Sequence, residues 1–228
     1  MTYILNIETA THICSVALSN NGETIDLEES FEDKTHAELL TVFIEKILER
    51  NSLSTKDLSA IAVSEGPGSY TGLRIGLSVA KGLCYGLDIP LIFIPTLEAM
   101  ANGANKSIDD NYLLCPMIDA RRMEVYTALY NSKLKKEVDI HAKIIDSDSF
   151  KNNLENNRIV FFGTGSDKCK ADICSSNAVF LDNSFVSSQF MSDLSYHKFI
   201  GKSFENLAYC EPFYLKEFQA IKSTKKFF

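Results

Sequence analysis

The stretch that decides the fold is rich in glycine and runs Gly66-Pro67-Gly68-Ser69-Tyr70-Thr71-Gly72-Leu73-Arg74-Ile75-Gly76. The apolar run at 58–63 that precedes it has the length and composition of a buried strand. A helical pattern follows over about 72–85, and Gly86 stands where a helix commonly ends. A strand, a glycine-rich turn and a helix in this order are typical of an α/β domain.

The turn in this stretch has two interpretations. Backbone N–H groups at a helix start point outward with the positive end of the helix dipole, so the turn could bind an anion or nucleotide weakly. The residues of such a site are Gly66, Gly68, Ser69 and Thr71. Alternatively, the glycines only permit a tight turn and a hydroxyl only caps the helix, which is the commoner outcome. The stretch is not a P-loop, because no Gly-Lys-Ser/Thr follows the glycines.

Small residues form one stripe along the following helix, at Gly72, Gly76 and Ala80. Each interior glycine costs a helix roughly 1 kcal/mol relative to alanine. The stripe either packs on the protein's own sheet or lies against a helix of another chain. Arg74 sits in the first turn, where a cation opposes the helix dipole, and needs solvent or an acidic partner. We predict that the stripe and Arg74 face another chain.

The residues before this stretch predict three strands and a helix. Apolar runs at 3–7, 13–18 and 24–31, with a turn at Asn20-Asn21-Gly22, indicate an antiparallel meander. Apolar residues at helical spacing predict a helix over 37–50, which Thr35 and Glu38 could cap. Adding a short strand at 90–94 and a helix from Thr96 to about Asn102 gives a ribonuclease-H-like mixed sheet with helices on both faces.

The second half predicts a smaller α/β unit. A polar linker at 102–111 precedes strands at 112–117, 124–130, 143–145 and 159–162, a short helix from Ser147 and a helical segment at 187–199. We therefore expect an N-terminal domain over 1–104 that carries the partner-binding helices. The shortened second domain, over 105–228, ends in a helix and a frayed basic tail at 222–228.

Composition excludes several classes of protein. The chain has 228 residues and a net charge of −7, which argues against a broad basic face for nucleic acid. Its six cysteines form no CxxC pair and indicate reduced thiols. No leader or membrane-spanning run is visible, so we expect a cytoplasmic protein.

Five ordered motifs resemble those of the TsaB (YeaZ) family. The stretch 66–76 matches the family signature closely, and the resemblance is thin only over 130–205. The other motifs are 4–11 with 14–18, 36–40, 119–121 with 124–126, and 211–215. One departure is Glu8, where the family usually has Asp.

The resemblance implies a two-lobed actin-like fold with a shortened second domain, and a role in making threonylcarbamoyladenosine beside the anticodon of tRNA. It implies a non-catalytic subunit that pairs with TsaD through the helices at about 36–50 and 72–86. The same surface would pair two copies when TsaD is absent. TsaE would join the complex, TsaC would make the threonylcarbamoyl adenylate, and tRNA would be reached only through the complex. No cofactor is implied.

Placement on these two helices predicts a partner interface formed by Leu39, Val42, Phe43, Lys46, Gly72, Arg74, Gly76 and Ala80. The helix at 37–50 is apolar over more than one stripe, so one face can pack on the sheet while another stays available.

The sequence lacks residues that a TsaD-type active site or a phosphate loop of this superfamily would need. A TsaD-type metal site needs two histidines at i and i+4, and the four histidines form no such pair. The superfamily's phosphate loop usually has Gly two residues after its Asp, whereas Ala10 follows Glu8 here, and its Cβ would obstruct a phosphate. Asp119, Arg121 and Glu124 could form an acid–base set, but a hairpin with charges paired across its turn is more typical. A metal-dependent peptidase and a small nucleotide-dependent phosphotransferase remain alternatives.

Overall fold

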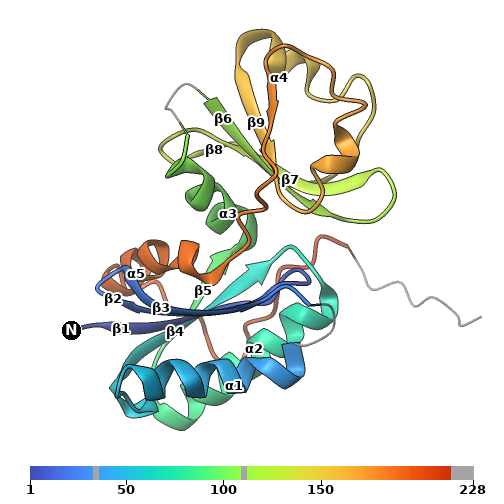
Figure 1. Cartoon of the computed structure of the whole chain (residues 1–228). Helices are drawn as coiled ribbons and strands as arrows, with labels where there is room; N and C mark the ends of the chain where they lie inside the picture. Colours follow the sequence, from blue (N-terminus) through green and yellow to red (C-terminus); the bar gives the residue numbers. More distant parts are fainter. Residues whose placement is uncertain (33–35, 109–111, 217–228) are drawn as a thin grey trace, which may run out of the picture.

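The structure, a computed structural model, describes residues 1–32, 36–108 and 112–216 and contains two five-stranded mixed sheets (Figure 1). In the first sheet, β1 (Tyr3–Glu8), β2 (Cys14–Asn20) and β3 (Glu23–Ser30) form the predicted antiparallel meander. Asn21 and Gly22 turn the chain between β2 and β3 with positive φ angles. Two parallel strands, β4 (Leu58–Gly66) and β5 (Leu91–Pro95), complete the order β3-β2-β1-β4-β5.

Helices cover both faces of this sheet (Figure 1). α1 (His36–Arg50) and α2 (Tyr70–Leu87) lie side by side on one face and bury apolar residues against β2 and β4. On the other face, α5 (Ser192–Ile200) packs on β1 and β5. The short 3₁₀ turn η1 (Thr55–Asp57) leads into β4.

The second sheet follows the order β10-β9-β6-β7-β8. Its strands are β6 (Tyr112–Asp119), β7 (Glu124–Tyr130), β8 (Lys136–Ile144), β9 (Arg158–Phe162) and β10 (Ala178–Phe180), with 3₁₀ turns η2 (Asp167–Cys169) and η3 (Ser188–Met191). The strands predicted at 112–117, 124–130 and 159–162 are confirmed as β6, β7 and β9. The strand predicted at 143–145 coincides only with the end of the longer β8, β10 was not predicted, and the helix expected from Ser147 is α4 (Lys151–Asn156). Two mixed sheets with helices confirm the α/β class.

Several predicted helix ends differ from the structure. α2 ends at Leu87, with left-handed Asp88 as its C-cap, so Gly86 lies inside the helix. α3 (Thr96–Asn105) continues into the predicted linker, because Asn102 is buried and donates to Phe190 O at 2.8 Å. Thr96 starts α3 without a side-chain cap. The proposed cap Thr35, residues 109–111 of the linker and the tail at 222–228 lie outside the described residues.

The chain returns from the second sheet to the first. Ser188, in η3, donates from its backbone N to Ser15 Oγ on β2 at 3.0 Å, and Ser195, in α5, donates to Asn6 Oδ1 on β1 at 2.7 Å. α3 contacts strands of both sheets. The division between residues 104 and 105 stays a prediction, and the C-terminal helix contacts the first sheet.

Candidate functional site

Three of the motifs meet at the start of α2. The β1–β2 turn reaches the signature stretch 66–76, where Ser69 N donates to Ala10 O at 2.6 Å. From the C-terminal side, Phe213 N donates to Glu65 O at 2.8 Å. The signature stretch is therefore held between two segments that are distant from it in sequence.

The glycines of this stretch are explained by close backbone contacts. A Cβ at Gly68 would lie 2.2 Å from Ala10 O, and one at Gly72 would lie 2.1 Å from Thr9 O. Gly66 has a φ of +115°, which side chains rarely adopt. The β1–β2 turn therefore packs so closely that only glycine fits at these positions.

The same contacts favour the structural interpretation of the turn over an anion site. Ser69 Oγ accepts from Gly72 N at 3.3 Å, as a helix cap does, and Ser69 N already donates to Ala10 O. Ser69 and Thr71 are exposed, whereas Gly66 is buried. Carbonyl oxygens of the chain itself thus lie where an anion would approach, and a weak anion site remains only a prediction.

The prediction that the stripe of small residues faces another chain is wrong. Gly72, Gly76 and Ala80 are buried, and a Cβ at Gly76 would lie 2.2 Å from Thr9 Oγ1. The stripe therefore packs on the chain's own β1–β2 turn and sheet. A Cβ at Gly82 or Gly86 would meet no atom of the described residues within 4 Å, so the open glycines of α2 lie further along the helix.

Four predicted interface residues lie on α1, and they divide between surface and core. Val42 is 39 % exposed, Lys46 is exposed and Leu39 is half-buried. Phe43 is only 5 % exposed and belongs to the core under the first sheet, so its placement in an interface is wrong. Arg74, on α2, is exposed as predicted.

A groove of about 420 Å³ runs between α1 and α2. Its apolar lining comes from both helices and from the loop after α1, and glutamates stand on the α1 side. The lining residues are Thr41, Ile44, Glu45, Leu48, Glu49, Leu53, Thr55, Val79 and Leu83. Sequence reasoning missed Val79 and Leu83, although they stand four residues apart on the flank of α2 that borders the glycine stripe.

The charged turn between β6 and β7 is a hairpin, as predicted. Its charges do not pair across the turn, however, because lysines from elsewhere in the chain reach them. Asp119 pairs with Lys168, and Glu124 pairs with Lys216. Asp119 also accepts from Arg121 N at 2.9 Å, which shapes the turn. Asp119 and Glu124 therefore form structural ion pairs with these lysines. The pair with Lys216 joins the C-terminal segment to the second sheet.

Glu8 lies buried at the end of β1, where its Oε1 accepts from Ala10 N at 2.6 Å. Burial removes water from the carboxylate and raises its pKa from 4.5 to about 7. The hydrogen bond from Ala10 opposes this change in pKa without cancelling it. At a pH between about 4.5 and 7, Glu8 is therefore ionised in the unfolded chain and takes up a proton when the chain folds.

We expect the free energy of unfolding to fall as the pH rises from about 4.5 to about 7. In this window the folded chain binds more protons at Glu8 than the unfolded chain does, so stability is lost as the pH rises. Glu8→Gln mimics the protonated side chain and should remove about 2 kcal/mol of this decline between roughly pH 5 and 8. Urea denaturation measures both proteins, and identical pH dependence would contradict the buried neutral carboxyl.

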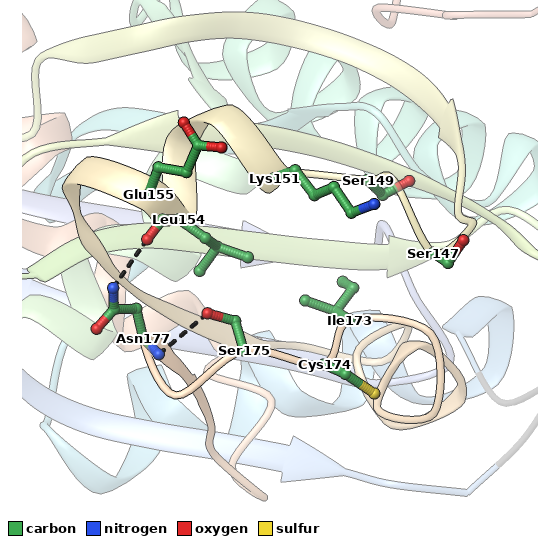
Figure 2. Close-up of a pocket in the computed structure, with 9 residues that line it drawn as sticks. All are labelled: Ser147, Ser149, Lys151, Leu154, Glu155, Ile173, Cys174, Ser175 and Asn177. Carbon is green, nitrogen blue, oxygen red and sulfur yellow. Dashed lines mark hydrogen bonds between the residues drawn. The ribbon is translucent and has the colours of Figure 1, made fainter.

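A second hollow, of about 390 Å³, lies between α4 and the segment 173–177 (Figure 2). Some of its polar groups already have partners within the chain. Asn177 donates from its backbone N to Ser175 Oγ at 3.2 Å and from Nδ2 to Leu154 O at 2.8 Å. Lys151 pairs with Asp148. Because Asn177 and Lys151 are already engaged within the chain, we take the more apolar α1–α2 groove as the stronger candidate site.

The described residues, 1–32, 36–108 and 112–216, contain neither a metal-binding cluster nor a membrane-spanning helix. No three His, Cys, Asp or Glu side chains in these ranges lie together where they could hold a metal ion. Within the same ranges, no helix combines the length and the apolar character needed to cross a membrane.

Comparison with known proteins identifies the family. The family model described as TsaD, tRNA N6-adenosine threonylcarbamoyltransferase, matches residues 30–186. The tRNA threonylcarbamoyladenosine biosynthesis protein TsaB of Escherichia coli (strain K12) is 41% identical over 127 residues, 56% of this chain and 54% of that protein. The chain thus spans about half the length of this relative. TsaB of Haemophilus influenzae is 29% identical over 222 residues, which cover 93% of each chain.

Solved structures share the fold. YeaZ from Pseudomonas aeruginosa has a TM-score of 0.83 at 21% identity, over 94% of this chain and 100% of that chain. The activator of the 2-hydroxyisocaproyl-CoA dehydratase from Clostridium difficile has a TM-score of 0.52 at 10% identity, over 90% of this chain and 99% of that chain. These likenesses confirm the actin-like fold that the motifs implied. The chain belongs to the TsaD family and, within it, to the TsaB (YeaZ) members.

Proposed function

We propose that the chain is an accessory, non-catalytic subunit of the cytoplasmic complex that makes threonylcarbamoyladenosine in tRNA. It pairs with TsaD, TsaE joins this pair, and tRNA is reached only through the complex. The names of the TsaB relatives support the pathway. The observation that carries the pairing is the apolar groove between α1 and α2.

The groove has the composition of a docking surface for a helix. Ile44 and Leu48 of α1 form its floor, and Val79 and Leu83 of α2 form the opposite wall. At Gly82, beside this wall, a Cβ would have no neighbour within 4 Å among the residues that the structure describes, so another backbone can approach closely. An amphipathic helix could therefore bury its apolar side chains here. A second copy of the chain could occupy the same groove when TsaD is absent.

The β1–β2 turn supports a non-catalytic role. In the actin-like superfamily this turn carries the first phosphate loop, whereas Ala10 here packs against Gly68. Glu8, where the motif has an acid, bonds to Ala10 N and is buried. Thr9 O fills the space beside Gly72. The turn thus serves to hold the signature stretch against the sheet.

Reconstitution tests this function. The purified chain with TsaC, ATP, threonine and bicarbonate should give no modified tRNA, whereas adding TsaD and TsaE should give threonylcarbamoyladenosine. Omitting only the chain from the full mixture should lower the yield at least tenfold. Product formed by the chain with TsaC alone would contradict the accessory role.

Two further assays separate the alternatives. Cleavage of a protein substrate in the presence of zinc or iron would indicate a peptidase. Saturable micromolar-to-millimolar binding of ATP to the isolated chain would indicate a phosphotransferase cleft.

A further inference from the structure

Arg74 is an exposed cation held in a fixed position by aromatic side chains. It projects from α2 four residues after Tyr70, where the helix begins, and its guanidinium lies 4.2 Å from the ring centroid of Tyr70 and 5.9 Å from that of Tyr214. The two rings stack on each other with centroids 4.3 Å apart. Tyr214 comes from the C-terminal segment, so distant parts of the chain assemble this cluster.

Hydrogen bonds fix the orientation of the guanidinium. Its Nε donates to Tyr214 Oη at 3.1 Å, and its Nη2 donates to Tyr70 Oη at 2.8 Å. An arginine has five N–H groups, so three N–H groups remain on Nη1 and Nη2. Their planar fork matches the two oxygens of a carboxylate. The side chain has already lost much of the rotamer freedom that binding would otherwise cost.

The positive charge of Arg74 has no paired carboxylate in the described parts of the chain. None of their ion pairs includes Arg74, although the chain has 30 acidic residues. Glu211 is near enough for its charge to act on Arg74, without forming an ion pair. The positive charge of Arg74 is therefore available to a carboxylate of another chain.

We propose that Arg74, held by Tyr70 and Tyr214, binds an Asp or Glu side chain of the partner protein. This inference rests on the proposed pairing with TsaD and adds the chemistry of one contact. A carboxylate fits better than an RNA phosphate, because phosphate binding uses several clustered cations and here Glu211 is the neighbouring charge. Arginine beside aromatic rings is also a common centre of binding energy at protein interfaces.

The affinity of the full chain for TsaD of the same organism, measured at two salt concentrations, tests this contact. Arg74→Gln should weaken binding at least tenfold and reduce its salt dependence. Arg74→Lys should lie between, because it keeps the charge but loses the planar fork. Arg158→Gln is the matched control: Arg158 is also exposed and lies 4.6 Å from the ring centroid of Tyr112, on the second sheet. Its affinity for TsaD should equal that of the wild type.

Several outcomes would overturn the contact. If Arg74→Gln binds TsaD within twofold of the wild type and melts at the same temperature, the proposed contact is refuted. The proposed function would then still stand. Binding of tRNA by the isolated chain that Arg74→Gln abolishes, without a change in TsaD affinity, would assign the cluster to phosphate instead. If the wild-type chain does not bind TsaD at all, the proposed function itself fails, and the contact fails with it.

Discussion

Gly76→Leu is expected to destabilise the folded chain by more than about 3 kcal/mol, because its side chain would have to fit where Thr9 already lies. A Cβ alone would approach Thr9 Oγ1 to 2.2 Å and Val63 to 3.4 Å, and leucine adds three further carbons. The gain in helix propensity, under about 1 kcal/mol, is too small to offset this overpacking. For a chain of this size the melting temperature should fall by roughly 6–12 °C.

Gly82→Leu is the matched control on the same helix. It makes the same substitution six residues further along, at a position where a Cβ meets nothing within 4 Å in the described part of the chain. We expect a melting temperature equal to or slightly above that of the wild type. If Gly76→Leu melts like Gly82→Leu, the packing of the glycine stripe on the β1–β2 turn is refuted.

Leu83→Lys is expected to weaken the pairing with TsaD at least 100-fold, the largest effect on binding that the structure predicts. It replaces an apolar wall of the groove by a long charged side chain that an apolar docked helix would have to desolvate. The half-buried position and the nearby C-terminal end of α2 let an ammonium reach water, so the chain should fold.

The control for this variant is Ile144→Lys, on the second sheet, where the side chain is already 70 % exposed. Its affinity for TsaD should match the wild type. Light scattering should also show that Leu83→Lys stays monomeric at concentrations where the wild type forms dimers. Unchanged affinity of a folded Leu83→Lys chain would show that the partner docks elsewhere.

Local patterns were sufficient to predict most of the elements. The meander, α1 and α2 follow from apolar periods of two and 3.6 residues, and Asn21 with Gly22 marks the turn between β2 and β3. The end of α2 was predicted about two residues too early, because Asp88 and not Gly86 adopts the left-handed conformation usually given to glycine.

The face of α2 that lies inward could not be read from its sequence. Two sets of small residues, one containing Gly72 and Gly76 and the other Gly82 and Gly86, satisfy the same helical spacing. The β1–β2 turn decides between them, because Thr9 packs on the first set, and Thr9 is more than sixty residues away in sequence. The spacing of the glycines therefore predicted correctly that another backbone approaches α2 closely. That backbone belongs to the β1–β2 turn of the same chain and not to a partner, as we had predicted.

Long-range contacts also assemble the Arg74 cluster. The motifs at 66–76 and 211–215 were both visible in the sequence, but nothing local indicated that Tyr214 would reach Arg74, 140 positions away. The groove was missed for a similar reason, since Val79 and Leu83 read as ordinary core residues until α1 is placed beside them.

Hydroxyl-radical footprinting of the chain, alone and with TsaD, tests the central claim that the α1–α2 groove is the partner-binding surface. Docking in this groove predicts that oxidation of the half-buried Leu53 and Leu83 falls several-fold in the complex, while oxidation of the exposed Ile144 on the second sheet stays the same. Unchanged oxidation of these two leucines in a complex shown to be fully formed would contradict this assignment of the partner-binding surface.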